Sequence, residues 1–121
     1  MKILPLSDLH LEWGSPPPKY TFCEDDKQDT VAILAGDIAN NVSGVWYAEE
    51  YICPYVRHVI YVPGNHEYYG YEFYEVDRNI RNEIEKRGLI NMTLLNAGFP
   101  LAFGFGGMLA IDDVLFIGAT L

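Results

Sequence analysis

The stretch TVAILAGD (residues 30–37) decides the fold, because a continuous apolar run ends there at a glycine and an aspartate. Its first six residues combine β-branched and aliphatic side chains, which is typical of a strand buried on both faces of a parallel sheet. Gly36 lets the chain turn sharply after this strand and places Asp37 at the edge where the strand ends. Ligands collect at the carboxyl edge of parallel α/β sheets, so the stretch also indicates where the chemistry of the chain lies.

Two other apolar runs end in polar clusters in the same way. Residues 3–7 lead into Asp8-Leu9-His10, and residues 59–62, closed by Pro63, lead into Gly64-Asn65-His66-Glu67. Pro5 cannot donate a hydrogen bond to a sheet, so we expect the first strand to be bulged or unpaired there. Together the three strands would bring two carboxylates, two imidazoles and an amide to one edge of the sheet.

The rest of the chain continues an alternating pattern of strands and helices. The expected elements are a helix over 44–53, a longer helix over 71–87, a fourth strand over 90–95 and, after a glycine-rich turn at 104–107, a hairpin of residues 108–111 and 114–117. Ser43 is the expected cap of the first helix, and Gly88 is the expected end of the second. The order of the elements predicts an α/β fold, and the length predicts that residues 1–121 form one domain or part of one.

The helix expected over residues 71–87 has one apolar stripe. Phe73, Val76, Ile80 and Ile84 recur at spacings of three and four, which places them on one face. We expect charged side chains, Asp77 among them, to occupy the other faces.

The charge balance bears on the partners of the chain. Seventeen acidic residues stand against eight basic ones, for a formal charge of −9, and no basic run is visible. This argues against a broad nucleic-acid or membrane-binding surface. It does not argue against a phosphate substrate, because bound metal cations reverse the local field.

The cysteines and the hydropathy indicate a compartment. Cys23 and Cys53 lie 30 residues apart with no third cysteine, so we expect two reduced thiols rather than a disulfide framework. Residues 1–6 are too short for a signal-peptide core, and no apolar run approaches the length of a membrane span. We therefore expect a soluble cytoplasmic protein.

The side chains after the three strands have the chemistry of metal ligands. Asp8 and His10 are two residues apart, so in an extended chain they point to the same side. Asp37 has two carboxylate oxygens and could bridge two cations, and the amide oxygen of Asn65 is a hard ligand. His66 need not be a ligand and could donate a proton to a developing negative charge. Taken one at a time, such residues are also common in ordinary turns.

These motifs carry a family resemblance. Ser7-Asp8-Leu9-His10, Ala35-Gly36-Asp37-Ile38 and Pro63-Gly64-Asn65-His66-Glu67 resemble the first three conserved blocks of the calcineurin-like metallophosphoesterases. The resemblance implies a phosphomonoesterase or phosphodiesterase that uses a hydroxide activated by two divalent metal ions (Mn, Fe, Zn or Mg). It implies that Asp8 and His10 bind the first metal, that Asp37 bridges both, that Asn65 binds the second and that His66 is the catalytic histidine.

The chain also departs from the family pattern. The family forms a four-layer αββα sandwich of two sheets flanked by helices, and its later blocks supply a further histidine and a Gly-His-x-His pair. Neither block can be placed here, so we expect the N-terminal half of that sandwich, incomplete as it stands. His58 is the only other histidine; it precedes a strand, and we expect it to be a surface or structural residue.

Three residues beside His66 have two interpretations each. Tyr68 and Tyr69 could line a substrate pocket and stack on an aromatic leaving group, or could pack the following helix against the sheet. Glu67 could orient His66 or a metal-bound water from the second coordination shell, or could cap the next helix.

The missing histidines leave alternatives to an enzyme that is complete in one chain. A non-catalytic fragment of the family could act as a binding module through its unfinished sheet. A homo-oligomer or a second chain could also complete the sheet and the metal site.

Overall fold

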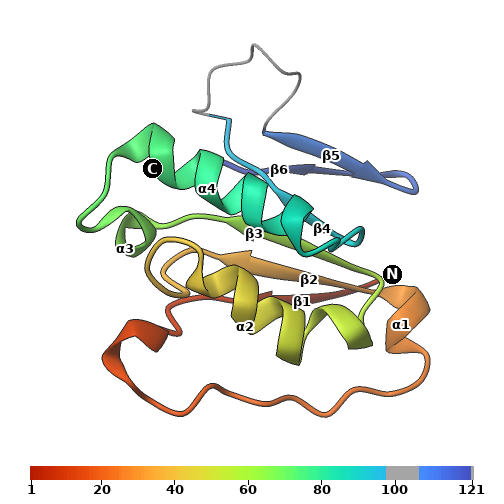
Figure 1. The fold of residues 1–121 in the computed structure, drawn as a ribbon. Coiled ribbons are helices and arrows are strands. Elements are labelled where there is room, and N and C mark those ends of the chain that lie inside the picture. The colour runs from red at the N-terminus through yellow and green to blue at the C-terminus, as the bar shows by residue number, and fades with distance from the viewer. Residues whose placement is uncertain (98–106, 121) are drawn as a thin grey trace.

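The protein is built on a parallel four-stranded sheet, as the computed structural model shows for residues 1–97 and 107–120 (Figure 1). The strands are β1 (Lys2–Leu6), β2 (Thr30–Ala35), β3 (His58–Val62) and β4 (Met92–Leu94), and they lie side by side in chain order. All three pairings are parallel. The predicted α/β class is therefore confirmed, and the carboxyl ends of the strands point to one edge.

Two helices cover one face of this sheet. They are α2 (Ser43–Tyr51) and α4 (Phe73–Lys86); the shorter elements are α1 (Asp26–Asp29), α3 (Asn65–Tyr68) and the 3-10 turns η1 (Leu11–Trp13) and η2 (Cys53–Tyr55). The core between helices and sheet contains Leu34, Tyr61, Val45, Val76 and Ile80, all fully buried. Burial of this apolar surface stabilises the layer at about 25 cal/mol per Å².

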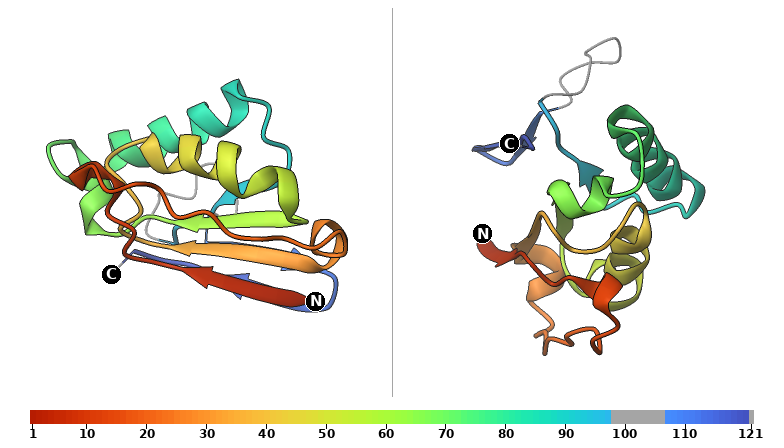
Figure 2. Two further views of the ribbon diagram at one scale, coloured as in Figure 1. Left: turned by 90° about the horizontal axis from the view of Figure 1, so that it is seen from below. Right: turned by 90° about the vertical axis from the view of Figure 1, so that its left-hand side faces the viewer.

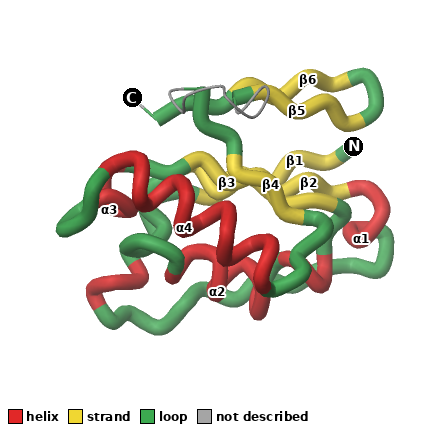
Figure 3. Tube along the Cα trace, turned by 45° about the horizontal axis from the view of Figure 1, so that its top comes forward, coloured by secondary structure: helices red, strands yellow, loops and turns green. Residues whose placement is uncertain are grey.

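A hairpin covers the opposite face. Its strands β5 (Met108–Ile111) and β6 (Val114–Ile117) pair antiparallel, as predicted. A second apolar cluster joins the hairpin to Val31, Ile60 and Leu95, and Figures 2 and 3 show hairpin and helices on opposite sides of the sheet. The sheet is thus the middle of three layers. Most of the glycine-rich turn predicted at 104–107 falls outside the described residues.

The bulge predicted at Pro5 is wrong. The register runs without a break from Lys2 to Leu6, with Pro5 opposite Ile33. β1 is an edge strand of the described sheet, so the missing N–H of Pro5 can face away from β2 and costs no ladder bond.

Two predictions about helix residues are also corrected. Ser43 is the first residue of α2 and not its cap, since the cap position belongs to Val42. Asp77 does not lie on a solvated face of α4: it is fully buried, because Tyr68 and Asn96 donate hydrogen bonds to its carboxylate. Gly88 adopts a left-handed φ of +64° directly after α4, which confirms it as the end of that helix.

Candidate metal centre at the strand ends

The loops that follow β1, β2 and β3 are tied together by hydrogen bonds. The backbone N–H of Asp8 donates to the Gly36 carbonyl (3.1 Å), and that of His10 donates to the Asp37 carbonyl (3.0 Å). The N–H of His66 donates to Oδ1 of Asp37 (3.0 Å). The three polar clusters predicted from the sequence therefore meet at one place.

Two glycines allow this close approach. Gly36 has a left-handed φ of +85°, and a Cβ added there would lie 3.0 Å from the Cα of Gly64. A Cβ on Gly64 would collide with the Asp37 carboxylate and with its backbone nitrogen. The glycines bring the second and third loops into contact and hold Asp37 against the backbone of the third.

The backbone itself is strained at the predicted ligands. Asp8, His10 and Asp37 have φ values of +54°, +46° and +55°, in the left-handed region that side chains rarely adopt. Each such conformation costs about 1 kcal/mol or more and clusters at functional sites in proteins. Three of the four predicted ligands therefore have this conformation, which aspartate and histidine adopt more readily than most residues. Asn41 and Asp112, outside the predicted ligand set, have it as well.

Asp8, His10 and Asp37 form the first cluster. Each offers one ligand atom, and these atoms lie within 4.8 Å of one another. Nε2 of His10 is 3.8 Å from Oδ1 of Asp8, whose side chain is 67% exposed. A hollow of about 230 Å³ opens beside Asp8, Asp37 and Asn65. Two carboxylates and an imidazole are a donor set that fits a divalent cation.

Asn65 faces Asp37 through its side-chain amide. The hydrogen-bonding pattern places the amide nitrogen toward Asp37, 3.1 and 3.2 Å from its carboxylate oxygens, while the amide oxygen accepts from the Tyr69 hydroxyl. Asn65 would have to turn its amide over to present the oxygen to a cation beside Asp37. Its role as a metal ligand stays a prediction.

Glu67 holds the second and third loops together. Its fully buried carboxylate accepts from the backbone N–H groups of Asp37 (3.0 Å), Ile38 (2.8 Å) and Gly64 (2.8 Å), and from the Tyr61 hydroxyl (2.9 Å). The bond to Gly64 caps the short helix α3, which contains Glu67 itself, and not the following helix α4 that the sequence suggested. The carboxylate orients the Asp37 loop, and no hydrogen bond joins it to the His66 ring in the described part of the chain.

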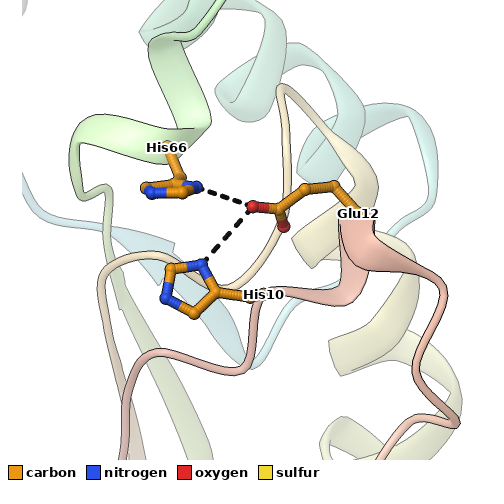
Figure 4. A group of neighbouring side chains, drawn as sticks. All are labelled: His10, Glu12 and His66. Carbon is orange, nitrogen blue, oxygen red and sulfur yellow. Dashed lines mark hydrogen bonds and ion pairs between the residues drawn. The ribbon is translucent and has the colours of Figure 1, made fainter.

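The sequence alone did not single out Glu12, whose carboxylate lies between two histidines (Figure 4). Its Oε1 is 2.7 Å from Nδ1 of His66 and 3.4 Å from Nδ1 of His10. Burial raises the pKa of the Glu12 carboxyl, but hydrogen bonds from its own backbone N–H, from His66 and from His10 outweigh this and lower the pKa overall. His10, Glu12 and His66 form a second cluster with metal-ligand spacing.

Aromatic rings surround the two histidines. Trp13 stacks on His10 at 4.2 Å between centroids and is 68% exposed. The Tyr69 ring lies 4.5 Å from the His66 ring, and its substrate contact stays a prediction. Tyr68 instead stacks on Phe73 and donates to Asp77 (2.6 Å), contacts of the kind that the packing interpretation predicts.

Two other features lie away from this edge. His58 begins β3, half-buried, with Nε2 2.9 Å from the Thr93 hydroxyl, as expected for a structural histidine. A larger hollow, of about 350 Å³, lies at the end of α4 and is lined mainly by Ile84, Leu89, Ile90 and Met92. It contains neither cluster, so the smaller hollow at the strand ends is the candidate site.

Comparisons with known proteins point the same way. A family model described as calcineurin-like phosphoesterase matches residues 1–117. Searches of curated proteins and of solved structures returned no match. Among the described residues, no helix has the length and apolar character needed to cross a membrane.

Proposed function

The chain belongs to the calcineurin-like phosphoesterase family, and from this premise we propose that it hydrolyses phosphate esters at a metal centre beyond the ends of β1, β2 and β3. The observation that carries the proposal is the convergence of Asp8, His10 and Asp37, all on left-handed backbone. Such strain is retained in proteins where the surrounding structure imposes it for function.

The residues divide the metal-binding role among them. Asp8 and His10 would hold one divalent cation with Asp37, and Asn65 would share Asp37 in a second position. Divalent cations at such a centre supply positive charge to phosphoryl oxygens and make water acidic enough to attack phosphorus. The number of ions and their identity, among Mn, Fe, Zn and Mg, belong to this proposal.

The histidine at the edge of the cluster has a separate part. His66, with both ring nitrogens protonated, would donate the proton on Nε2 to the oxygen that leaves phosphorus. Water would add to phosphorus and lose a proton as the P–O ester bond breaks and an alcohol departs. Tyr69, beside the His66 ring, would contact the leaving group. The substrate is then a phosphomonoester or phosphodiester.

We also propose a reducing compartment such as the cytoplasm, because Cys23 and Cys53 are both unpaired.

The test compares three forms of the protein. We expect wild type to bind Mn²⁺ and to hydrolyse an aryl phosphodiester or monoester, and we expect Asp37→Ala to lose both activities. Asp113→Ala removes an exposed carboxylate at the hairpin turn, away from the cluster, and serves as the matched control. Metal content and turnover that are the same in all three forms would refute the proposal.

A second candidate function follows from the hairpin. β5 and β6 expose Met108, Leu115 and Ile117, although they also cover the sheet. An apolar surface of this kind fits a binding module, or a partner chain that completes the sheet and the metal site. A protein that binds Mn²⁺ weakly without turnover, and whose mass in solution exceeds that of one chain, would favour this function.

A further inference from the structure

Glu12 makes the shortest contact to the proposed proton donor. Its Oε1 is 2.7 Å from Nδ1 of His66, and its side chain is only 16% exposed. The same oxygen lies 3.4 Å from Nδ1 of His10. The Glu12 carboxylate therefore contacts both imidazole rings: that of His10, the proposed metal ligand, and that of His66, the proposed proton donor.

The local fold fixes Glu12 in this place. His10 turns the chain through its left-handed φ, and the 3-10 turn η1 follows immediately, closed by the N–H of Trp13 on the His10 carbonyl (3.1 Å). Leu11 packs against the core, and its N–H donates to the Ile38 carbonyl (2.9 Å). Glu12 is thus anchored by the residues on either side of it.

The contact determines which nitrogen of His66 carries a proton. An ionised carboxylate only accepts hydrogen bonds, so Nδ1 of His66 must be the donor. Nε2 of His66 has no hydrogen-bond partner among the described residues. Nδ1 is therefore committed to Glu12, and Nε2 is the ring nitrogen left for another partner.

The same logic applies to His10. With Nδ1 donating to Glu12, its Nε2 carries the lone pair and lies on the side of Asp8, 3.8 Å from Oδ1. Histidines that bind metals commonly donate their second N–H to a carboxylate, which fixes the tautomer and the ring orientation.

The second carboxylate oxygen of Glu12 indicates that this residue does not serve only to stabilise the fold. Oε2 is buried and has no hydrogen-bond partner among residues 1–97 and 107–120. An unsatisfied buried acceptor lowers stability. Glu67, which ties the loops together, has both of its oxygens paired. Glu12 is held for its contact with the two rings at a cost in stability.

We propose that Glu12 is a positioning residue that accepts the Nδ1–H of both His66 and His10. This leaves Nε2 of His10 with its lone pair for the metal. It also makes Nε2 of His66 the nitrogen that exchanges a proton with the substrate: Nε2 has a lone pair in the neutral ring and carries the proton to be donated in the doubly protonated ring. The assignment of the tautomers rests on geometry alone. What each Nε2 then does rests on the proposed function.

The direct test is ¹⁵N NMR of the imidazoles in the metal-free full chain at about pH 8, where unperturbed imidazoles are neutral. The chain has three histidines, and His58, bonded to Thr93, is an internal reference. We expect wild-type His66 to be mainly Nδ1–H. Glu12→Met should shift His66 to the Nε2–H form, whereas Glu12→Gln should keep Nδ1–H because its amide oxygen still accepts. Glu85→Met, at an exposed site on α4, is the matched control. A His66 signal unchanged in Glu12→Met would overturn the proposal.

A kinetic test separates this inference from the proposed function. With Mn²⁺, Glu12→Met should lower kcat about 10–100-fold for an alkyl ester, whose leaving group needs a proton. It should lower kcat much less for a nitrophenyl ester, whose leaving group does not. Equal losses for the two esters would overturn the positioning role. A wild type without turnover would refute the proposed function but would leave the tautomer result standing.

Discussion

Two polar clusters of this protein are built in opposite ways. In the Asp77 network, which comprises Tyr68, Asp77, Asn96 and Thr120, the hydrogen bonds run from group to group: both oxygens of Asp77 accept, and Asn96 accepts from Thr120. The strand-end cluster comprises Asp8, His10, Glu12, Asp37, Asn65 and His66. One of its carboxylates is exposed, one buried oxygen has no partner in the part of the chain that the structure describes, and three of its residues have left-handed φ.

The difference separates a structural cluster from a functional one. A buried network whose members are satisfied stabilises the fold and specifies its packing. A cluster that keeps strain and unpaired oxygens lowers stability and is retained for what it binds. Substitutions should therefore affect stability in the first cluster and metal binding in the second.

The largest effect is expected at Glu67, which supports the strand-end cluster from beneath. Glu67→Gln would place an amide N–H₂ against backbone donors, so we expect the free energy of unfolding to fall by about 3–4 kcal/mol. Mn²⁺ affinity should fall as well, because the Asp37 loop loses its support. Urea unfolding and a Mn²⁺ titration measure the two effects. A variant as stable as wild type would show that Glu67 does not hold the loops.

The second-largest effect is expected for Asp77→Ala, which should lower stability without changing metal binding. Asp77→Ala removes the acceptor of Tyr68 and Asn96 and should cost about 2–3 kcal/mol of unfolding free energy. Burial raises the pKa of Asp77, so removal of this disfavoured charge offsets part of the cost. Mn²⁺ affinity should stay that of wild type. A loss of Mn²⁺ affinity in the folded variant would mean that the two clusters are coupled.

Asp8→Asn should have the opposite result to Asp77→Ala: metal binding should weaken while stability stays nearly unchanged. Its side chain is exposed and asparagine tolerates a left-handed φ, so unfolding free energy should change by less than about 0.5 kcal/mol. Mn²⁺ affinity should nevertheless fall about 10–100-fold or more, since a ligand is lost. Calorimetric titration of Mn²⁺ beside urea unfolding checks both, and an unchanged affinity would remove Asp8 from the site.

The smallest effect concerns His58, which lies outside both clusters. Burial, with a contribution from Arg57, lowers the pKa of His58 below 6.5. The unfolded chain therefore takes up the proton first on acidification, so the stability that neutral His58 provides is present above about pH 6.5 and is lost as the pH falls toward the folded-state pKa. His58→Gln should flatten this part of the pH profile. A profile identical to that of wild type would exclude His58 as its source.

Much of the fold could be predicted because the sequence patterns are local. The apolar run at residues 30–35 and the stripe on residues 73–84 each depend on a short window, and both became the elements expected. The regular pairing at Pro5 and the burial of Asp77 could not be predicted from a short window of sequence. The tolerance of Pro5 depends on β1 lying at the edge, and the burial of Asp77 depends on partners 9 and 19 residues away along the chain.

The candidate site also has residues that could be predicted from the sequence and one, Glu12, that could not. The parallel topology could be predicted, and it brings the loops of Asp8, His10 and Asp37 to one edge of the sheet. The extended backbone assumed for Asp8 and His10 is wrong: both lie beyond β1 with left-handed φ values. Glu12 was missed because its partner His66 is 54 residues away. A signal was present: Glu12 continues the alternation of Asp8 and His10. The turn η1, which brings it over His66, could not be foreseen from that alternation.

The central claim is that the strand-end cluster binds a divalent cation through Asp37. The most direct measurement is thermal unfolding of wild type and Asp37→Asn across a Mn²⁺ titration. A ligand at about 100 times its dissociation constant stabilises the folded state by about 2.7 kcal/mol. We predict that Mn²⁺ raises the Tm of wild type and leaves that of Asp37→Asn unchanged. An equal rise in the two proteins, or none in wild type at millimolar Mn²⁺, would contradict the account.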